Sequence, residues 1–129
     1  MGTPAAVQND LITATCAGHQ IPNPASGAPQ PGPPFPFSAP VTLGCEPTVL
    51  IGGVPAAVVG ANGLNTPPHV GLHVSDPFAV PAVQKGTITG GSPTVLIGGK
   101  PAARTGSSCI VCFGAPGQLT GTAATVQIA

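Results

Sequence analysis

The histidines and cysteines of this chain occur in pairs. The 129 residues contain three histidines and four cysteines. Three pairs stand close together in the sequence: Cys16 with His19, His69 with His73, and Cys109 with Cys112. Imidazole nitrogen and thiolate sulfur are the donors that Zn²⁺ prefers in four-coordinate structural sites. The pairs therefore indicate one structural zinc ion to which three segments contribute, although sites of this donor type also accept iron.

Disulfide bonds are the alternative use of the same cysteines. Four cysteines allow three pairings, of which Cys16–Cys45 with Cys109–Cys112 is one. The first ten residues, MGTPAAVQND, contain neither a basic region nor an apolar stretch, so we expect no Sec signal. Because disulfides are rare in reducing compartments, the sequence favours the metal. The disulfide alternative stays open, and Cys45 has no role in the metal hypothesis.

An internal repeat predicts how three distant segments could meet. Residues 47–57 read PTVLIGGVPAA, and residues 93–103 read PTVLIGGKPAA. Pro-Ala-Ala occurs a third time near the N-terminus, and the chain closes on ATVQI at 124–128. The chain thus opens with the second half of a repeat, at 2–7, and closes with the first half. Joining the two ends would produce a third unit around a pseudo-threefold axis.

Each repeat predicts a β-hairpin. The run TVLI lies between proline and Gly-Gly, which is typical of a short buried strand that ends in a tight turn. A single hairpin cannot bury its apolar face, but three hairpins around an axis can share a narrow core of small residues. We therefore predict an all-β fold, a small cone of β-hairpins with a pseudo-threefold repeat. A flat sandwich of two hairpins is the alternative.

The segments between the repeats are predicted to be irregular loops that converge on a metal-braced point. They span residues 11–44, 61–86 and 105–119. The first contains a proline-rich stretch at 20–41, whose prolines predict extended, polyproline-like backbone. We expect at most one short helical turn, near 77–84.

The composition excludes several classes of function. Charged residues make up 5% of the chain, against about 25% in typical soluble domains. No cluster of lysine and arginine is present, which argues against nucleic-acid binding. No apolar run approaches the ~18 residues of a membrane-spanning helix. Because such a charge-poor surface limits solubility, we expect much of it to contact a partner.

The carboxylates give no support to an enzyme. They are Asp10, Glu46 and Asp76, and none lies in a motif such as H-E-x-x-H. Catalytic zinc requires an open coordination position and a general base. Asp76 follows His73 closely enough that we expect it to orient that ring. We therefore predict a protein without enzymatic activity.

The repeated phrase resembles the PAAR-repeat proteins, which are named for the tetrapeptide Pro-Ala-Ala-Arg. Residues 101–104 match that tetrapeptide fully, whereas the copies at 4–7 and 55–58 lack the arginine. Two further segments are similar to the family: PPHVG at 67–71 and CFGAPGQLTGTAATVQI at 112–128. The resemblance covers nearly the whole chain and implies a single domain over 1–129.

The resemblance implies the tip of a spike. Such proteins cap the trimeric β-helical spike (VgrG-like) of a contractile injection machine, either a type VI secretion system or a phage-tail-like particle. One copy binds each trimer through the base of the hairpins, and three histidines and one cysteine hold zinc near the point. Carried over by position, the ligands are His19, His69, His73 and Cys112, with Cys109 and Cys16 as alternates.

The resemblance also implies where the protein acts. We expect it to be made in the cytoplasm, assembled on the spike and delivered outside or into a target cell. Contact with the target membrane would be transient, and an effector could bind non-covalently at the proline-rich loop. The alternative function is a free-standing structural zinc module that serves as an adaptor for an effector or toxin.

Overall fold

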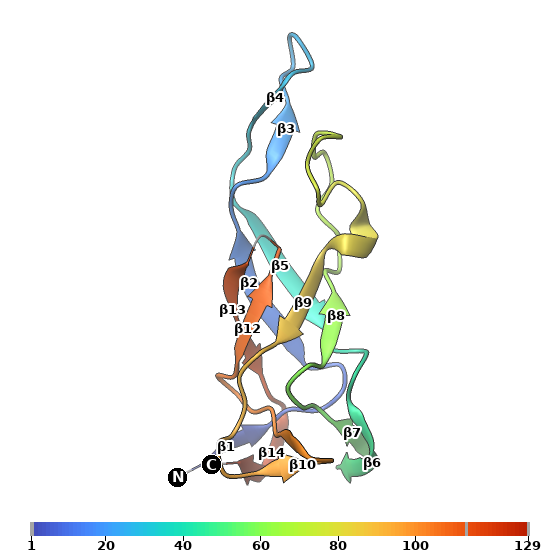
Figure 1. The fold of residues 1–129 in the computed structure, drawn as a ribbon, viewed down its shortest axis with the longest axis vertical. Coiled ribbons are helices and arrows are strands. Elements are labelled where there is room, and N and C mark those ends of the chain that lie inside the picture. The colour runs from blue at the N-terminus through green and yellow to red at the C-terminus, as the bar shows by residue number, and fades with distance from the viewer. Residues whose placement is uncertain (1, 113, 129) are drawn as a thin grey trace.

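The computed structural model describes residues 2–112 and 114–128, and these residues form an all-β fold (Figure 1). A single turn of 3₁₀ helix, η1 (Pro81–Val83), lies within the segment where a helical turn was expected. The strands in chain order are β1 (Thr3–Ala5), β2 (Leu11–Cys16), β3 (Gln20–Pro22), β4 (Pro29–Pro31), β5 (Phe35–Pro40), β6 (Glu46–Ile51), β7 (Val54–Ala56), β8 (Asn62–Leu64), β9 (Lys85–Ile88), β10 (Leu96–Ile97), β11 (Lys100–Pro101), β12 (Ser108–Val111), β13 (Ala115–Thr120) and β14 (Ala123–Ile128).

Three two-stranded antiparallel hairpins form the base of the molecule. The two full repeats form β6–β7 and β10–β11, and the two chain ends form β1–β14. In the third hairpin Thr3 pairs with Ile128, so the two half-repeats are joined as the sequence predicted. Figure 1 shows these hairpins together at one end of the elongated molecule. The alternative of a flat sandwich of two hairpins is wrong.

The Gly-Gly pairs of the repeats connect the strands as expected. Gly52 and Gly53 have φ values of 61° and 82°, and Gly98 and Gly99 have values of 59° and 82°. Positive φ at both central residues is the signature of a type I′ turn, whose twist matches that of the strands it joins. Residues with a Cβ atom rarely adopt this conformation, which explains the choice of glycine.

The Pro-Ala-Ala segments meet in a closed ring of backbone hydrogen bonds. The N–H of Ala6 donates to Ala103 O (3.1 Å), that of Ala103 to Ala57 O (3.0 Å), and that of Ala57 to Ala6 O (3.0 Å). All three alanines are fully buried. A second set repeats the pattern at 2.9–3.0 Å: Gln8 to Pro55, Val59 to Pro101, and Thr105 to Pro4. The pseudo-threefold axis is therefore visible in the backbone itself.

Above the ring, the segments that were expected to be loops form a six-stranded sheet. Its order is β5-β2-β13-β12-β9-β8, which is three antiparallel pairs laid side by side. The edge strands β5 and β8 approach each other, because Leu43 and Asn62 form a bridge and Thr66 donates to Ser38 O (2.8 Å). A Cβ atom on Gly63 would overlap the carbonyl of Pro40. The sheet is thus nearly closed.

The proline-rich stretch 20–41 is more regular than predicted. It forms the β3–β4 hairpin and then β5, which pairs with β2 along its whole length. Polyproline and β backbones share one region of φ/ψ space, and proline is tolerated in edge strands because those need fewer N–H donors. Figure 1 shows the β3–β4 hairpin projecting from the end opposite the base.

A larger side chain at the ring should destabilise the fold. We expect Ala57→Leu to lower the free energy of unfolding by at least about 1–3 kcal/mol, the usual cost of overpacking a filled core. Chemical denaturation measures this change. Val54→Lys is the matched control, because lysine occupies the equivalent position 100 of the other repeat. Equal stability of both variants would contradict the importance of the ring.

Candidate metal centre

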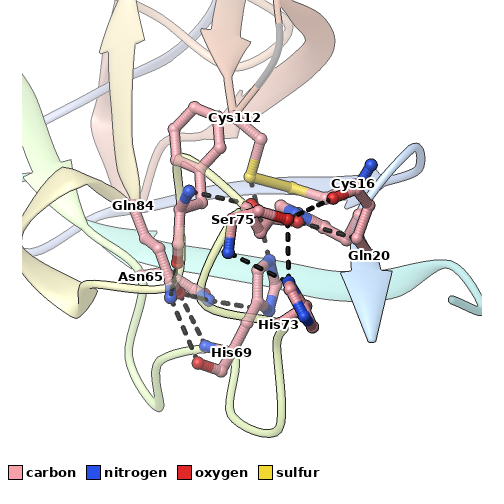
Figure 2. A network of polar contacts seen from close by, with 11 residues as sticks. Cys16, Gln20, Asn65, His69, His73, Ser75, Gln84 and Cys112 are labelled. Carbon is pink, nitrogen blue, oxygen red and sulfur yellow. Dashed lines mark hydrogen bonds and ion pairs between the residues drawn. A yellow bond between two sulfur atoms is a disulfide. The ribbon is translucent and has the colours of Figure 1, made fainter. Parts of the chain in front are cut away.

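Four of the paired residues meet at the end of the sheet that is farther from the base. The ligand atoms of Cys16, His19, His69 and Cys112 all lie within 4.8 Å of one another. The first three side chains are buried, and Cys112 is half-buried. Figure 2 shows His69 beneath the two sulfur atoms. Three segments of the chain therefore contribute, as the pairing in the sequence predicted.

The three strand pairs of the sheet position these residues. Cys16 ends β2, and His19 follows in the connection toward β5. His69 lies in the connection between β8 and β9, and Cys112 lies in the turn between β12 and β13 with a φ of 46°. Each strand pair thus supplies its own connecting segment to one point. The pseudo-threefold axis of the base continues up to this site.

The sulfur atoms of Cys16 and Cys112 form a disulfide. Neither of the pairings suggested from the sequence, Cys16–Cys45 or Cys109–Cys112, is present. The side chain of Cys109 is buried in the hydrophobic core. Its thiol donates to Ser107 O (3.5 Å), and burial raises the pKa of the thiol to about 11. Cys45 precedes β6, outside the group of four, and burial also raises its pKa. Adjacent strand ends, not closeness in sequence, decide which thiols meet.

His73 lies outside the group of four, and Cys16 is the fourth member in its place. Its Nδ1 contacts Ser75 Oγ (2.8 Å), and its Nε2 contacts Gly27 O (3.1 Å). Its backbone N–H donates to Gln20 O (2.8 Å). His73 therefore fastens the 65–84 connection to the β3–β4 hairpin. As a metal ligand it stays a prediction that this arrangement does not favour.

Asp76 orients His19, and not His73 as we expected. Its Oδ2 lies 3.1 Å from His19 Nδ1 and accepts from the N–H of Gln20 (2.8 Å), while its Oδ1 accepts from the N–H of Phe78 (2.8 Å). Burial raises the pKa of Asp76, but the two backbone hydrogen bonds and His19 outweigh it and leave the pKa below its ordinary value. The carboxylate fixes the proton of neutral His19 on Nδ1, so that Nε2 is the nitrogen suited to a metal.

The neighbour of His69 Nδ1 is a hydrogen-bond donor, whereas that of His19 Nδ1 is an acceptor. Asn65 Oδ1 accepts from the N–H of Ser38 (2.9 Å), which turns its amide Nδ2 toward His69 Nδ1 (3.2 Å) and Gln84 Oε1 (3.1 Å). Gln84 is fixed in turn, because its Oε1 accepts from the N–H of His69 (2.6 Å). An amide N–H requires an acceptor. Neutral His69 therefore carries its proton on Nε2, which lies 3.7 Å from Cys112 Sγ.

Aromatic rings enclose the two histidines. The ring centres of His19 and His69 are 5.0 Å apart, and those of Phe35, Phe37 and Phe78 lie 5.2–6.3 Å from one or the other histidine ring. Burial lowers the pKa of His69, and His19 adds to this effect while Asp76 opposes it. Burial therefore favours the neutral imidazole of His69, which is the form that binds metals.

The donor set fits a structural zinc ion once the disulfide is reduced. Two thiolates and two imidazoles are a common tetrahedral set for zinc. Binding through His69 Nε2 would require the ring to move its proton to Nδ1, against the Asn65 amide. Sequence reasoning missed Asn65 and Gln84, because their roles arise from backbone contacts made only in the folded chain.

Comparison with known proteins agrees with the family resemblance that the repeated phrase indicated. The family model described as PAAR motif matches residues 80–129, which include the second full repeat and the closing half-repeat. The family that the sequence resembles is thus confirmed over these residues. No match was found among curated proteins.

The protonation of the two rings can be measured directly. In the oxidised protein, long-range ¹H–¹⁵N spectra should place the neutral proton on Nδ1 of His19 and on Nε2 of His69. Asn65→Asp replaces the amide donor by an acceptor and should move the His69 proton to Nδ1. A His69 proton on Nδ1 in the unchanged protein would contradict the orientation assigned to Asn65.

The fourth ligand can be identified by zinc content. After reduction, His73→Ala should retain one zinc per chain, because His73 lies outside the group. Cys16→Ser and His69→Ala should lower zinc affinity by at least about tenfold. Loss of a residue that only orients a metal ligand already costs about that much, and these two residues are themselves ligands. Elemental mass spectrometry on the three variants measures the difference. Loss of zinc from His73→Ala with retention in Cys16→Ser would restore the set implied by the resemblance.

Proposed function

We propose that this protein, which carries a PAAR motif over residues 80–129, is the non-enzymatic tip that caps the trimeric spike of a contractile injection machine. The three-hairpin base is the observation that carries the proposal. A trimeric spike presents three equivalent strand ends, and one chain can meet all of them only if it repeats the same element three times. The ring at Ala6, Ala57 and Ala103 provides that repetition.

The base has the features of a surface that awaits a partner. Among the described residues, β6, β10 and β14 each pair with one strand only, which leaves backbone groups for β-augmentation. Leu50 and Leu96 occupy equivalent positions of the repeat and are 58% and 64% exposed. The third equivalent position holds Gln127, which is also exposed. Symmetry-related exposed leucines support an apolar interface with a threefold partner.

The proposed role of the metal centre is structural. Cys16, His19, His69 and Cys112 would hold zinc, which when bound would cross-link three connecting segments of the chain. Three of the four residues are buried and phenylalanine rings enclose the histidines, which supports a brace more than a site that receives substrate. The role of the protein would then be mechanical.

The other features of the proposal follow from this role. The protein would be made in the cytoplasm, assembled on the spike without the Sec pathway and delivered to the outside or into a target cell. Contact of the β3–β4 hairpin with the target membrane would be transient, and the same hairpin could receive an effector. The described residues contain no helix with the length and apolar character needed to span a bilayer.

Binding to the spike can be tested by stoichiometry. Mixed with the purified trimeric spike protein of the same injection machine, the chain should form a complex of one copy per trimer, measured by size exclusion with light scattering. Leu50→Asp should weaken this complex by at least about tenfold, because burying an unpaired carboxylate costs about 1–3 kcal/mol or more. Val74→Asp is the control, because Val74 is 89% exposed in the 65–84 connection, away from the base.

The alternative is a free-standing zinc module that serves as an adaptor for an effector or toxin. It predicts that the chain binds no trimer, or that it binds with three copies per trimer. Either result would contradict the capping role while leaving the metal centre intact. Equal binding by Leu50→Asp and the unchanged chain would contradict the assignment of the base as the interface.

A further inference from the structure

We propose that Cys16 and Cys112 alternate between holding a metal and forming a disulfide, so that the centre exchanges one brace for another when it is oxidised. The inference rests on the proposed function in one respect, which is that zinc occupies this centre in the reduced protein. It goes beyond that function because it assigns a reversible, redox-dependent change to two particular sulfur atoms.

The geometry of the two cysteines suits both states. Their Cα atoms are 6.2 Å apart, within the usual range for a disulfide of about 4.4–6.8 Å. The same two sulfurs lie with His19 and His69 in a group whose ligand atoms are all within 4.8 Å of one another. The thiolates can therefore form either bond without a large movement of β2 or of the β12–β13 turn.

The chemistry of the exchange is balanced with a peroxide as the oxidant. One thiolate attacks the peroxide, forms a sulfenic acid and releases water after protonation. The second thiolate attacks the sulfenic sulfur, forms the disulfide and releases a second water. Two thiolates, one hydrogen peroxide and two protons thus yield one disulfide and two waters. The two sulfur atoms would then no longer be available to hold a metal ion. A dithiol reductant reverses the oxidation by thiol–disulfide exchange.

The surroundings of the histidines support both states. Asp76 holds His19 in the orientation suited to a metal, whereas Asn65 and Gln84 hold the proton of His69 on Nε2, toward the Cys112 sulfur. The first arrangement favours the zinc form, and the second favours the disulfide form. A centre built only to hold zinc would be expected to place an acceptor beside both rings.

The exchange keeps the connecting segments tied together. The disulfide links β2 to the β12–β13 turn, which are two of the three segments that zinc would join. The third segment stays attached through Asp76, which accepts from the backbone N–H of Gln20 (2.8 Å), and through His73, whose N–H donates to Gln20 O (2.8 Å). Oxidation on leaving a reducing cytoplasm would therefore release the ion without unfolding the end of the molecule.

The experiment uses the full chain, reduced and loaded with zinc. Hydrogen peroxide is added in steps while a chromogenic chelator reports released zinc, and alkylation with mass spectrometry maps the remaining thiols. We expect one zinc to be released for each two thiols lost, with both losses at Cys16 and Cys112. A dithiol with added zinc should restore the starting state. The double variant Cys45→Ser, Cys109→Ser should behave identically, because it retains both reacting cysteines.

Each other outcome overturns the proposal. Zinc that stays bound after thiols are lost, or a disulfide that joins Cys109 to Cys112, would contradict the exchange and leave the zinc brace intact. Failure of the reduced chain to bind zinc would contradict both the exchange and the brace, but not the capping of the trimer, which is measured separately. If the double variant does not fold, thiol mapping on the unchanged chain decides the result alone.

Discussion

Three backbone hydrogen bonds, each from one alanine to the next, close a ring at the base of this molecule. The bonds join Ala6, Ala57 and Ala103 at 3.0–3.1 Å, and all three residues are fully buried. Every segment that passes through the ring must have the same local conformation and a very small side chain. The Pro-Ala-Ala sequence meets both conditions, and its recurrence at three places is the direct consequence of this geometric constraint.

The ring also determines where the rest of the chain goes. Where each of the three segments leaves the ring, it makes an equivalent backbone hydrogen bond of 2.8–2.9 Å. The N–H of Asn9 donates to Val41 O, that of Gly60 to Ile88 O, and that of Gly106 to Leu119 O. Each exit leads into one strand pair of the six-stranded sheet. The connections of the three pairs then meet at the far end, where the cysteines and histidines lie. Base and metal centre are thus two ends of one pseudo-threefold arrangement.

The sequence predicted those features that repeat or that depend on local chemistry. The duplicated phrase was sufficient for the two full hairpins and their glycine turns, because these join residues close together in the chain. It also predicted the joining of the chain ends, because each end carries the half-repeat that the other lacks. The six-stranded sheet was missed, since its pairs join segments of dissimilar sequence and Thr13 meets Ser38 and Gln118 only after folding. Proline at 36 and 40 in β5 hid that strand further.

The candidate site was also predicted in part. The pairing of Cys16 with His19 and of Cys109 with Cys112 indicated the right segments, but sequence spacing could not say which thiol of a pair faces the centre. Alternation along β12 buries Cys109 in the sheet, and the turn that follows brings Cys112 to Cys16. Asp76 lies three residues from His73 yet reaches His19 across the fold. Such choices depend on strand register and turn conformation, which no local motif records.

Two cysteines and two histidines from three segments can hold one metal at the far end from the base. X-ray absorption at the zinc edge, on the reduced and zinc-loaded protein, tests it most directly. With these four ligands, we expect two sulfur neighbours at about 2.3 Å and two nitrogen neighbours at about 2.0–2.1 Å. One sulfur with three nitrogens would show that His73 and not Cys16 completes the site, and a shell of oxygen atoms would show that the cluster does not bind zinc.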